Sequence, residues 1–220
     1  MLPDFVCNEK VTSTELDGDN VIREKVVESL FTGVQRTREA NRVHFAFTES
    51  REVQAIDGKP VPRGTPFPKL PYRFGGGYSS LISSTFAPDN LPVHNYTLGD
   101  TYRSAESTAV LVRFTTKPNQ QKLRGIIQGK ELVEKDKGAA WIDPKTFQVL
   151  RLQRQSLNLP PGLTRSIATV DYGAVKIGDS TFWMPLHIRA EINEQNSKVT
   201  LSYIAEYSNC HKFMAEVKFD

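Results

Sequence analysis

The most restrictive feature of this sequence is a regular alternation of apolar and polar residues near its C-terminal end. Apolar residues at 186, 188, 190 and 192 alternate with polar or charged ones. After a polar turn at 194–197 the alternation resumes and continues to Tyr207. Because successive side chains of a strand point to opposite faces, the pattern predicts a long antiparallel hairpin with one buried face.

Similar patterns predict strands over most of the remaining chain. They cover residues 4–16, 42–57, 110–114, 139–153 and 169–185, with tight turns at Asp57-Gly58, Asp143-Pro144 and Gly178-Asp179. Residues 21–36 are ambiguous, because their apolar spacing fits a helix while their valines and Gly33 count against one. In total we predict nine to eleven strands.

A single helix is predicted after the glycines at 75–77. Tyr78, Leu81, Ile82 and Phe86 recur there at helical spacing and form one apolar side. Glycines before a helix often bind phosphate, but a phosphate-binding loop needs Lys and Ser or Thr after its last glycine. Tyr78 stands at that position, so the glycines are interpreted as the break that lets a helix begin.

These elements predict a mainly β (α+β) fold in one domain spanning residues 1–220. A sheet of so many strands must twist and curl. We therefore expect a curved antiparallel sheet that forms an incomplete barrel, with the helix across its concave face. The proline-rich residues 58–76 are expected to form a long loop rather than a domain linker, because strand patterns resume on both sides.

Composition and motifs exclude several classes of function. The net charge is only +3, with Lys and Arg scattered among 25 acidic residues, so no nucleic-acid surface is expected. No apolar run is long enough for a transmembrane helix, and the first residues do not read as a signal peptide. The histidines at 44, 94, 187 and 211 lack metal-ligand spacing, so neither a metal nor a cofactor is expected.

Catalysis is not expected either. No G-x-S-x-G motif is present, and Ser79 and Ser80 have no neighbouring base in the sequence. A serine esterase with Ser79 as nucleophile and a distant histidine is the best enzymatic alternative.

Two charged residues could lie among apolar ones. Glu49 and Arg51 share the parity of Phe45 and Phe47, which would direct both charges into the interior, where a pair could orient a ligand head group. Alternatively, a β-bulge near Ser50 would turn both side chains to water.

The two cysteines, Cys7 and Cys210, lie in predicted strands near opposite ends of the chain. They can form a disulfide if those strands are neighbours, and otherwise they are two buried thiols. A disulfide would indicate an oxidising compartment.

Some segments resemble a known superfamily. The stretches WIDPKTFQVLRLQ and VDYGAVKIGDSTFWMPLHIRAEI resemble the central strands of the LolA-like superfamily of periplasmic lipoprotein carriers and sensors. In addition, LPDFVCNEKV with SNCHKFMAEVKF is similar to uncharacterised exported bacterial proteins that carry the same two terminal cysteines. The resemblance favours a strand for residues 21–34. It also implies an inward arginine that holds a lid, for which Arg51 and Arg113 are the candidates.

The resemblance implies a non-catalytic, periplasmic or secreted protein that binds an apolar ligand, such as a lipid or a lipoprotein acyl chain, inside the open barrel. The expected ligand-binding residues are Phe45, Phe47, Glu49, Arg51, Tyr78, Leu81, Ile82, Phe86, Val112 and Phe114. The alternative is an envelope protein-interaction or stress-sensing module in which side chains fill the interior.

Overall fold

The computed structural model describes residues 3–35, 47–74, 78, 80–88, 90–103, 108–120, 122–127, 130–195 and 197–213. The described part is mostly β-strand, as predicted. The strands are β1 (Phe5–Asp17), β2 (Asn20–Gln35), β3 (Phe47–Ile56), β4 (Lys59–Pro60), β5 (His94–Arg103), β6 (Thr108–Thr116), β7 (Lys122–Ile127), β8 (Lys130–Glu134), β9 (Asp136–Ile142), β10 (Val149–Ser156), β11 (Leu163–Ile177), β12 (Ser180–Glu194) and β13 (Val199–Lys212). Helix α1 (Ser80–Phe86) and the 3-10 helix η1 (Leu91–Val93) lie between β4 and β5.

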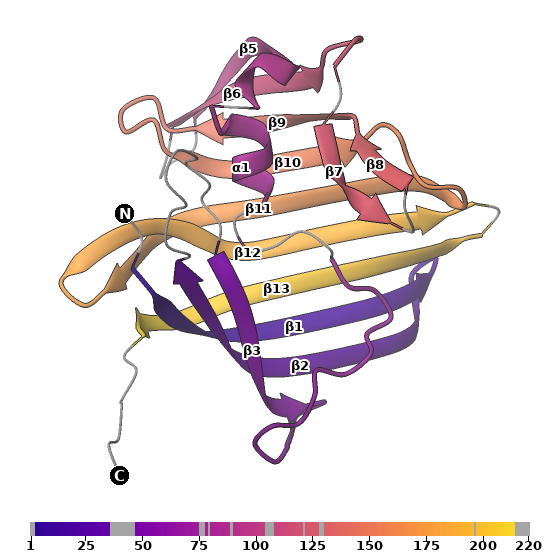
Figure 1. The fold of residues 1–220 in the computed structure, drawn as a ribbon, viewed down its shortest axis with the longest axis vertical. Coiled ribbons are helices and arrows are strands. Elements are labelled where there is room, and N and C mark those ends of the chain that lie inside the picture. Colours follow the sequence, from indigo (N-terminus) through magenta and orange to yellow (C-terminus); the bar gives the residue numbers. More distant parts are fainter. Residues whose placement is uncertain are drawn as a thin grey trace.

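Eleven of these strands form one antiparallel sheet that remains open. Their order is β4-β3-β2-β1-β13-β12-β11-β10-β9-β6-β5, and the separate hairpin β7-β8 interrupts the connection from β6 to β9. The first and last strands of the chain, β1 and β13, are neighbours in the interior of the sheet. Figure 1 shows β3 passing in front of β1 and β2, on the same side of the sheet as α1 and the β7-β8 hairpin. The sheet is therefore curved around this side.

Burial distinguishes the two faces of the sheet. In β1, the side chains of Phe5, Cys7, Glu9, Val11 and Ser13 are buried, whereas most of those between them are more exposed. We call the face with the buried side chains the inner face and the opposite one the outer face. The inner face carries the hydrophobic core, and α1 lies against it at β10.

The long loop after β4 also covers the inner face. Leu70 belongs to the buried core, and Tyr72, Phe67 and Phe74 pack against that core. Ser13 of β1 holds the loop in place, because its hydroxyl accepts from the backbone N–H of Tyr72 at 2.9 Å and donates to the Tyr72 carbonyl at 2.8 Å. We call this loop segment, residues 61–74, together with Tyr78 and α1, the cover.

Two of the sequence predictions need correction, and one ambiguity is resolved. The described residues contain thirteen strands, so the predicted nine to eleven is too few. Helix α1 begins at Ser80, so Tyr78 precedes the helix instead of lying on it. Residues 21–34 are strand, within β2, because the alternation of Val27, Ser29 and Phe31 places them on the inner face. Within the described ranges, no helix has the length and apolarity needed to span a membrane.

Candidate functional site

Small side chains are buried on the inner face of four strands. Ala140 of β9, Ala168 of β11, Ala190 of β12 and Ala205 of β13 are all buried there. Ala168 and Ala190 lie directly opposite each other in the ladder between β11 and β12. Because alanine extends little above the sheet, this floor leaves room for whatever lies over it.

Helix α1 places its apolar side on the inner face at β10, whose Leu152 and Arg154 are paired with Ala140 and Ala168 of this floor. Leu81 and Thr85 are 1% and 0% exposed, and Ile82 and Phe86 pack against the core at its margin. The Phe86 ring lies 5.9 Å from the Tyr96 ring and 6.3 Å from the Phe114 ring, measured between centroids. The helix therefore touches β5 and β6 as well as β10.

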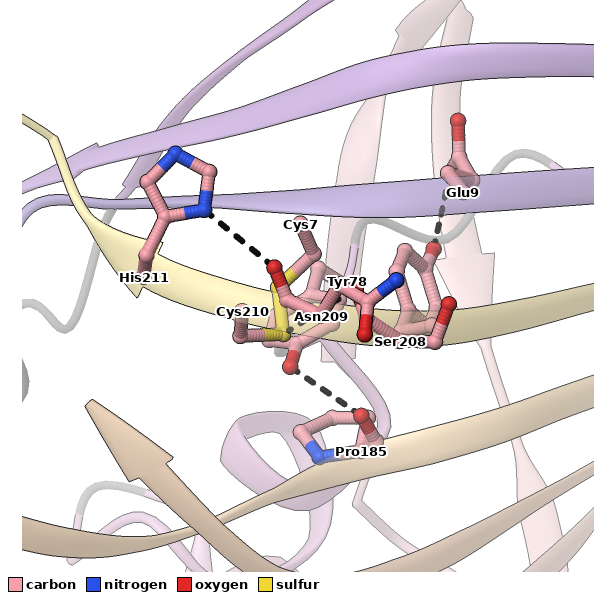
Figure 2. The surroundings of a disulfide bond; sticks show 9 residues. Cys7, Glu9, Tyr78, Pro185, Ser208, Asn209, Cys210 and His211 are labelled. Atoms are coloured by element: carbon pink, nitrogen blue, oxygen red, sulfur yellow. Dashed lines mark hydrogen bonds between the residues drawn. A yellow bond between two sulfur atoms is a disulfide. The ribbon is translucent and has the colours of Figure 1, made fainter.

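Tyr78 anchors the cover among aromatic rings of the core. Its ring is 3% exposed and lies 4.8 Å from Tyr207, 5.1 Å from Phe31 and 5.5 Å from Phe5, between centroids. Its hydroxyl donates to the carbonyl of Pro185 at 3.1 Å, and Figure 2 shows this bond beside the disulfide. Burial, with smaller effects of neighbouring groups, raises the pKa of Tyr78 far above its ordinary value.

The disulfide between Cys7 and Cys210 is present, and it joins β1 to β13 with 4.1 Å between the Cα atoms. Of the two possibilities left open by the sequence, the bridge is therefore the one realised. Figure 2 shows Tyr78 next to it. The bond fixes the part of the inner face on which the Tyr78 ring rests.

A buried ion pair lies beside Tyr78. The carboxylate of Glu9, on β1, accepts from Arg51 Nε at 2.7 Å and from Arg51 Nη2 at 2.9 Å. Ser29 and Tyr207 donate to the same carboxylate at 2.9 Å each. The Glu9 side chain is 0% exposed and that of Arg51 is 16% exposed. Burial alone would lower the pKa of Arg51, but the hydrogen bonds and charge of Glu9 raise it above its ordinary value.

Glu49 links this cluster to the cover. One of its carboxylate oxygens accepts from the backbone N–H of Tyr78 at 2.6 Å, and the other lies 3.7 Å from Arg51 Nη1. The pairing of β2 with β3 runs without a shift from Ser29 opposite Val53 to Gln35 opposite Phe47. The bulge considered near Ser50 is therefore absent, and Glu49 and Arg51 both lie on the inner side.

A second buried polar cluster lies beneath the other end of α1. His94 Nε2 is 2.7 Å from Asp136 Oδ1, and both side chains are 0% exposed. Thr116 donates to the same oxygen at 2.8 Å. Arg154 lies 3.8 Å from the other oxygen of Asp136 and donates to the hydroxyl of Ser84, on α1, at 3.0 Å. A polar cluster thus supports the helix from below.

This second cluster was not predicted from the sequence. Its members come from β5, β6, β9 and β10, so only the strand order brings them together. The spacing of His94 and Asp136 in the chain carries no recognisable motif. The one available signal was parity, because Arg154 shares the parity of the buried Leu152.

The structure divides the predicted site residues into two groups. Glu49, Arg51 and Tyr78 meet near β3, while Phe86, Val112 and Phe114 lie near β6, and Leu81 and Ile82 lie on the helix between them. Phe45 lies outside the described residues, as does the side chain of Phe47. Ser79, the nucleophile of the esterase alternative, is also outside them. Within the described part of the chain, no group of three metal-binding side chains occurs.

Two hydroxyl groups, one in the cover and one on β11, are buried without a partner among the described residues. The Thr85 hydroxyl, on the buried side of α1, and the Tyr172 hydroxyl, on β11, are buried without a hydrogen bond among the described residues. Buried polar groups in folded proteins are nearly always hydrogen-bonded. These two are therefore positions at which a ligand could supply a partner.

Solved structures align with most of this chain at low identity. Neither a family model nor a curated protein matches the sequence. Among solved structures, a DUF1329 family protein from Desulfovibrio piger aligns over 98% of this chain and 88% of its own, with 11% identity and a TM-score of 0.39. A LolA superfamily protein from Nitrosomonas europaea aligns over 97% and 88%, with 12% identity and a TM-score of 0.39.

A third structure, a domain named as an outer membrane lipoprotein-sorting protein from Vibrio parahaemolyticus, aligns over 94% of this chain and 84% of its own. Its identity is 11% and its TM-score is 0.36. Similarity at this level carries no functional conclusion, so the function has to be sought in the side chains of this chain.

Proposed function

We propose that the protein binds an apolar ligand, such as the acyl chain of a lipid or lipoprotein, between its inner face and its cover. The observation that carries this proposal is the placement of a short amphipathic helix against β10, whose neighbouring strands carry the buried alanines Ala140 and Ala168. A ligand would take the place of Leu81, Ile82 and Phe86 above Ala168 and Ala190. Removing each methylene from water contributes about 0.8 kcal/mol, so an acyl chain can offset the displacement of these side chains.

The attachments of Tyr78 and α1 suit a part of the cover that moves, while Ser13 keeps the loop segment in place. Their polar contacts include those of Tyr78 with Glu49 and Pro185 and that of Ser84 with Arg154. The hydroxyl of Tyr96 also donates to the carbonyl of Thr85 at 2.6 Å. Net hydrogen bonds contribute about 1 kcal/mol each, so a small number of them can be broken when a ligand enters. The unpartnered hydroxyls of Thr85 and Tyr172 would then meet a polar atom of the ligand, such as an ester oxygen.

Arg51 has no part in holding the ligand in this proposal. Its guanidinium is already paired with the buried carboxylate of Glu9, and its face lies 4.9 Å from the centroid of the Phe31 ring. Breaking a buried pair leaves an uncompensated charge, which is strongly unfavourable. Arg51 therefore holds β3 to β1, and Glu49 connects that pair to the cover.

A periplasmic or secreted location belongs to the same proposal. Disulfides form and persist in oxidising compartments, and Cys7 and Cys210 are bridged here. The names of two neighbours refer to the LolA superfamily and to lipoprotein sorting, which accords with such a location.

Native mass spectrometry of protein purified from its own host tests the proposal. We expect a lipid adduct that organic extraction removes. Replacing Ala168 by Leu should reduce the adduct, because the larger side chain fills the floor, while the matched replacement of Ala139, on the outer side of β9, should not. Thermal unfolding checks that both variants fold. Adduct-free native protein that also fails to bind a fluorescent fatty acid would contradict the proposal.

A second candidate is a protein-interaction module with a filled interior. It is favoured by the deep burial of Tyr78 and Leu81, which are 3% and 1% exposed. This candidate predicts that the fatty acid does not bind and that cross-linking α1 to the sheet leaves function unchanged. The same mass spectrometry experiment therefore separates the two candidates.

A further inference from the structure

An exposed phenylalanine marks the turn between β9 and β10. Phe147 is 80% exposed, and its φ of 58° lies in the left-handed region that bulky residues rarely adopt. Isolated exposed apolar residues are common on protein surfaces. Phe147 differs because its backbone conformation is unfavourable as well.

The turn that carries Phe147 is held by hydrogen bonds. The carboxylate of Asp143 accepts from the N–H of Lys145 at 2.7 Å and from that of Thr146 at 3.2 Å. The N–H of Phe147 donates to the Asp143 carbonyl at 2.8 Å, and the Asp143 N–H donates to the Gln148 carbonyl at 2.9 Å. These backbone bonds lower the pKa of Asp143 below its ordinary value. Phe147 is therefore presented by an ordered turn.

Aromatic residues lie on the outer face beside this turn. Trp141, one residue before the end of β9, is paired with Arg151 of β10 and with Leu111 of β6. Tyr102, on the edge strand β5, is 49% exposed and is paired with Ala109. Tryptophan and tyrosine combine an apolar ring with a polar tip, which suits the boundary between lipid and water.

The outer face next to these aromatic residues is basic. It carries five cations and two carboxylates on β6, β9, β10, residues 165–171 of β11 and residues 187–193 of β12. The cations are Arg113, Lys137, Arg151, Arg165 and Arg189, and the carboxylates are Asp171 and Glu191. Asp171 bonds both Arg151 and Arg189, which are 50% and 46% exposed and so still present charge to solvent. We call this region, with Trp141, Tyr102 and the turn 143–148, the basic corner.

The rest of the outer face has the opposite charge. This part consists of β13, β1 and residues 24–30 of β2. It carries one exposed cation, Lys10, and three exposed carboxylates, Glu24, Glu28 and Glu206. The outer face is thus divided into a basic part with exposed aromatic residues and an acidic part. A uniform anionic surface would attract the first part and repel the second.

We propose that the basic corner docks on the surface of an anionic phospholipid bilayer. Phe147 would enter the boundary between head groups and acyl chains, Trp141 and Tyr102 would lie at head-group depth, and the arginines would face anionic head groups. Charge complementarity favours this occupant, and the rigid apolar tip distinguishes it from a soluble polyanion, which has no apolar layer to receive a phenyl ring. The docking involves the outer face alone, so it does not depend on a ligand beneath the cover.

Co-sedimentation with vesicles tests this docking. The full chain should sediment with vesicles of phosphatidylcholine and phosphatidylglycerol and should remain in solution with phosphatidylcholine alone. Binding should weaken as salt is raised. Arg113→Gln and Arg151→Gln should each reduce the affinity by about fivefold. Lys10→Gln, in the acidic part, serves as the matched charge control and should not reduce it.

Phe147 supplies a test that separates docking from folding. Phe147→Gly should reduce vesicle affinity by about tenfold and at the same time raise the melting temperature, because glycine adopts a positive φ without strain. Leu157→Ser, at the opposite end of β10 and 47% exposed in the parent, should leave vesicle affinity unchanged. Equal binding to both vesicle types, or no binding to either, would overturn the proposal. It would also be overturned if the protein binds heparin and Phe147→Gly changes neither heparin binding nor vesicle affinity.

Discussion

Glu9 on β1 and Arg51 on β3 form a two-bond ion pair that passes over the strand between them. β2 separates these strands in the sheet, and Ser29 of β2 donates to the same carboxylate. The pair therefore reaches across the strand to which β1 and β3 are each hydrogen-bonded. The pair thereby ties β3 to β1 on the inner face of the sheet.

Removing one partner of this pair should be much worse than replacing both. Glu9→Ala should lower the free energy of unfolding by about 3–5 kcal/mol, because Arg51 is left as an unpaired charge in the interior. The double variant Glu9→Leu with Arg51→Met should regain most of this loss. Urea unfolding measures both. Glu52→Ala is the control, since Glu52 pairs with Arg63 at the surface and should change stability by less than about 1 kcal/mol. Equal losses in the single and double variants would contradict this account.

The pair of His94 with Asp136 should stabilise the cover. His94→Phe keeps a ring beside Phe114, whose centroid lies 5.5 Å from that of His94, but it removes the bond to the buried carboxylate. We expect a loss of about 2–3 kcal/mol and faster amide hydrogen exchange in α1. His211→Phe, at an exposed site, is the control and should stay within about 0.5 kcal/mol of the parent. Unchanged exchange in α1 would show that the cluster does not support the helix.

Buried tyrosines should make the protein sensitive to alkali. Burial, as the largest cause, raises the pKa of Tyr78, Tyr172, Tyr203 and Tyr207 above that of an exposed tyrosine. A raised folded-state pKa stabilises the fold below the unfolded value of about 10, and this stability is lost as pH rises further. Phenolate absorbance of these residues should therefore appear together with the loss of far-ultraviolet circular dichroism. In denaturant every tyrosine should titrate near pH 10 or so. Full titration before any loss of structure would disprove the assignment.

Reduction of the disulfide should destabilise the fold substantially. The bridge joins residues 203 positions apart, so the chain-entropy model gives about 5 kcal/mol. Urea unfolding with and without reductant measures the difference. The double variant Cys7→Ala with Cys210→Ala should show the same loss and no response to reductant. A parent protein with equal stability in both conditions would contradict the prediction.

Gly138 on β9 should not tolerate a side chain. A Cβ atom there would lie 2.0 Å from the carbonyl oxygen of Gln153 and 2.5 Å from Cζ of Phe114. Gly138→Ala should therefore cost at least about 3 kcal/mol or prevent folding, because a backbone atom cannot move aside cheaply. Thermal unfolding measures this, with the exposed neighbour Lys137→Ala as control, which should change little. A melting temperature equal to that of the parent would mean that β9 and β10 are farther apart than this.

The sequence predicted much of the local structure but not the strand order. Alternation in β12 and β13 predicted their hairpin because a buried face repeats every two residues. By contrast, pairing of Cys7 with Cys210 depends on β1 lying beside β13, and no local pattern encodes that neighbourhood. The pairing of His94 with Asp136 also depends on the strand order, so it could not be predicted from the sequence.

The buried charge of Glu9 could have been found from the sequence. Its parity in β1 is that of Phe5, Cys7 and Val11, so the predicted strand already placed it on the apolar side. Its partner could not have been chosen in the same way, because Arg51 and other cations share suitable parity in their own strands. For Glu49 and Arg51 the sequence left both faces of β3 open, and the register of β3 with β2, which has no shift near Ser50, places them on the inner face.

The adjacency of the first and last strands dictates when the molecule can be completed. During synthesis, one edge of β1 has no neighbour until residues 199–212 have been made. Unpaired edges favour association with other chains, so a newly made molecule has to keep this edge apart from other chains until β13 has been made. A chain that stops short of β13 would yield two unconnected sheets, β4 to β1 and β12 to β5, and no smaller version of the native one.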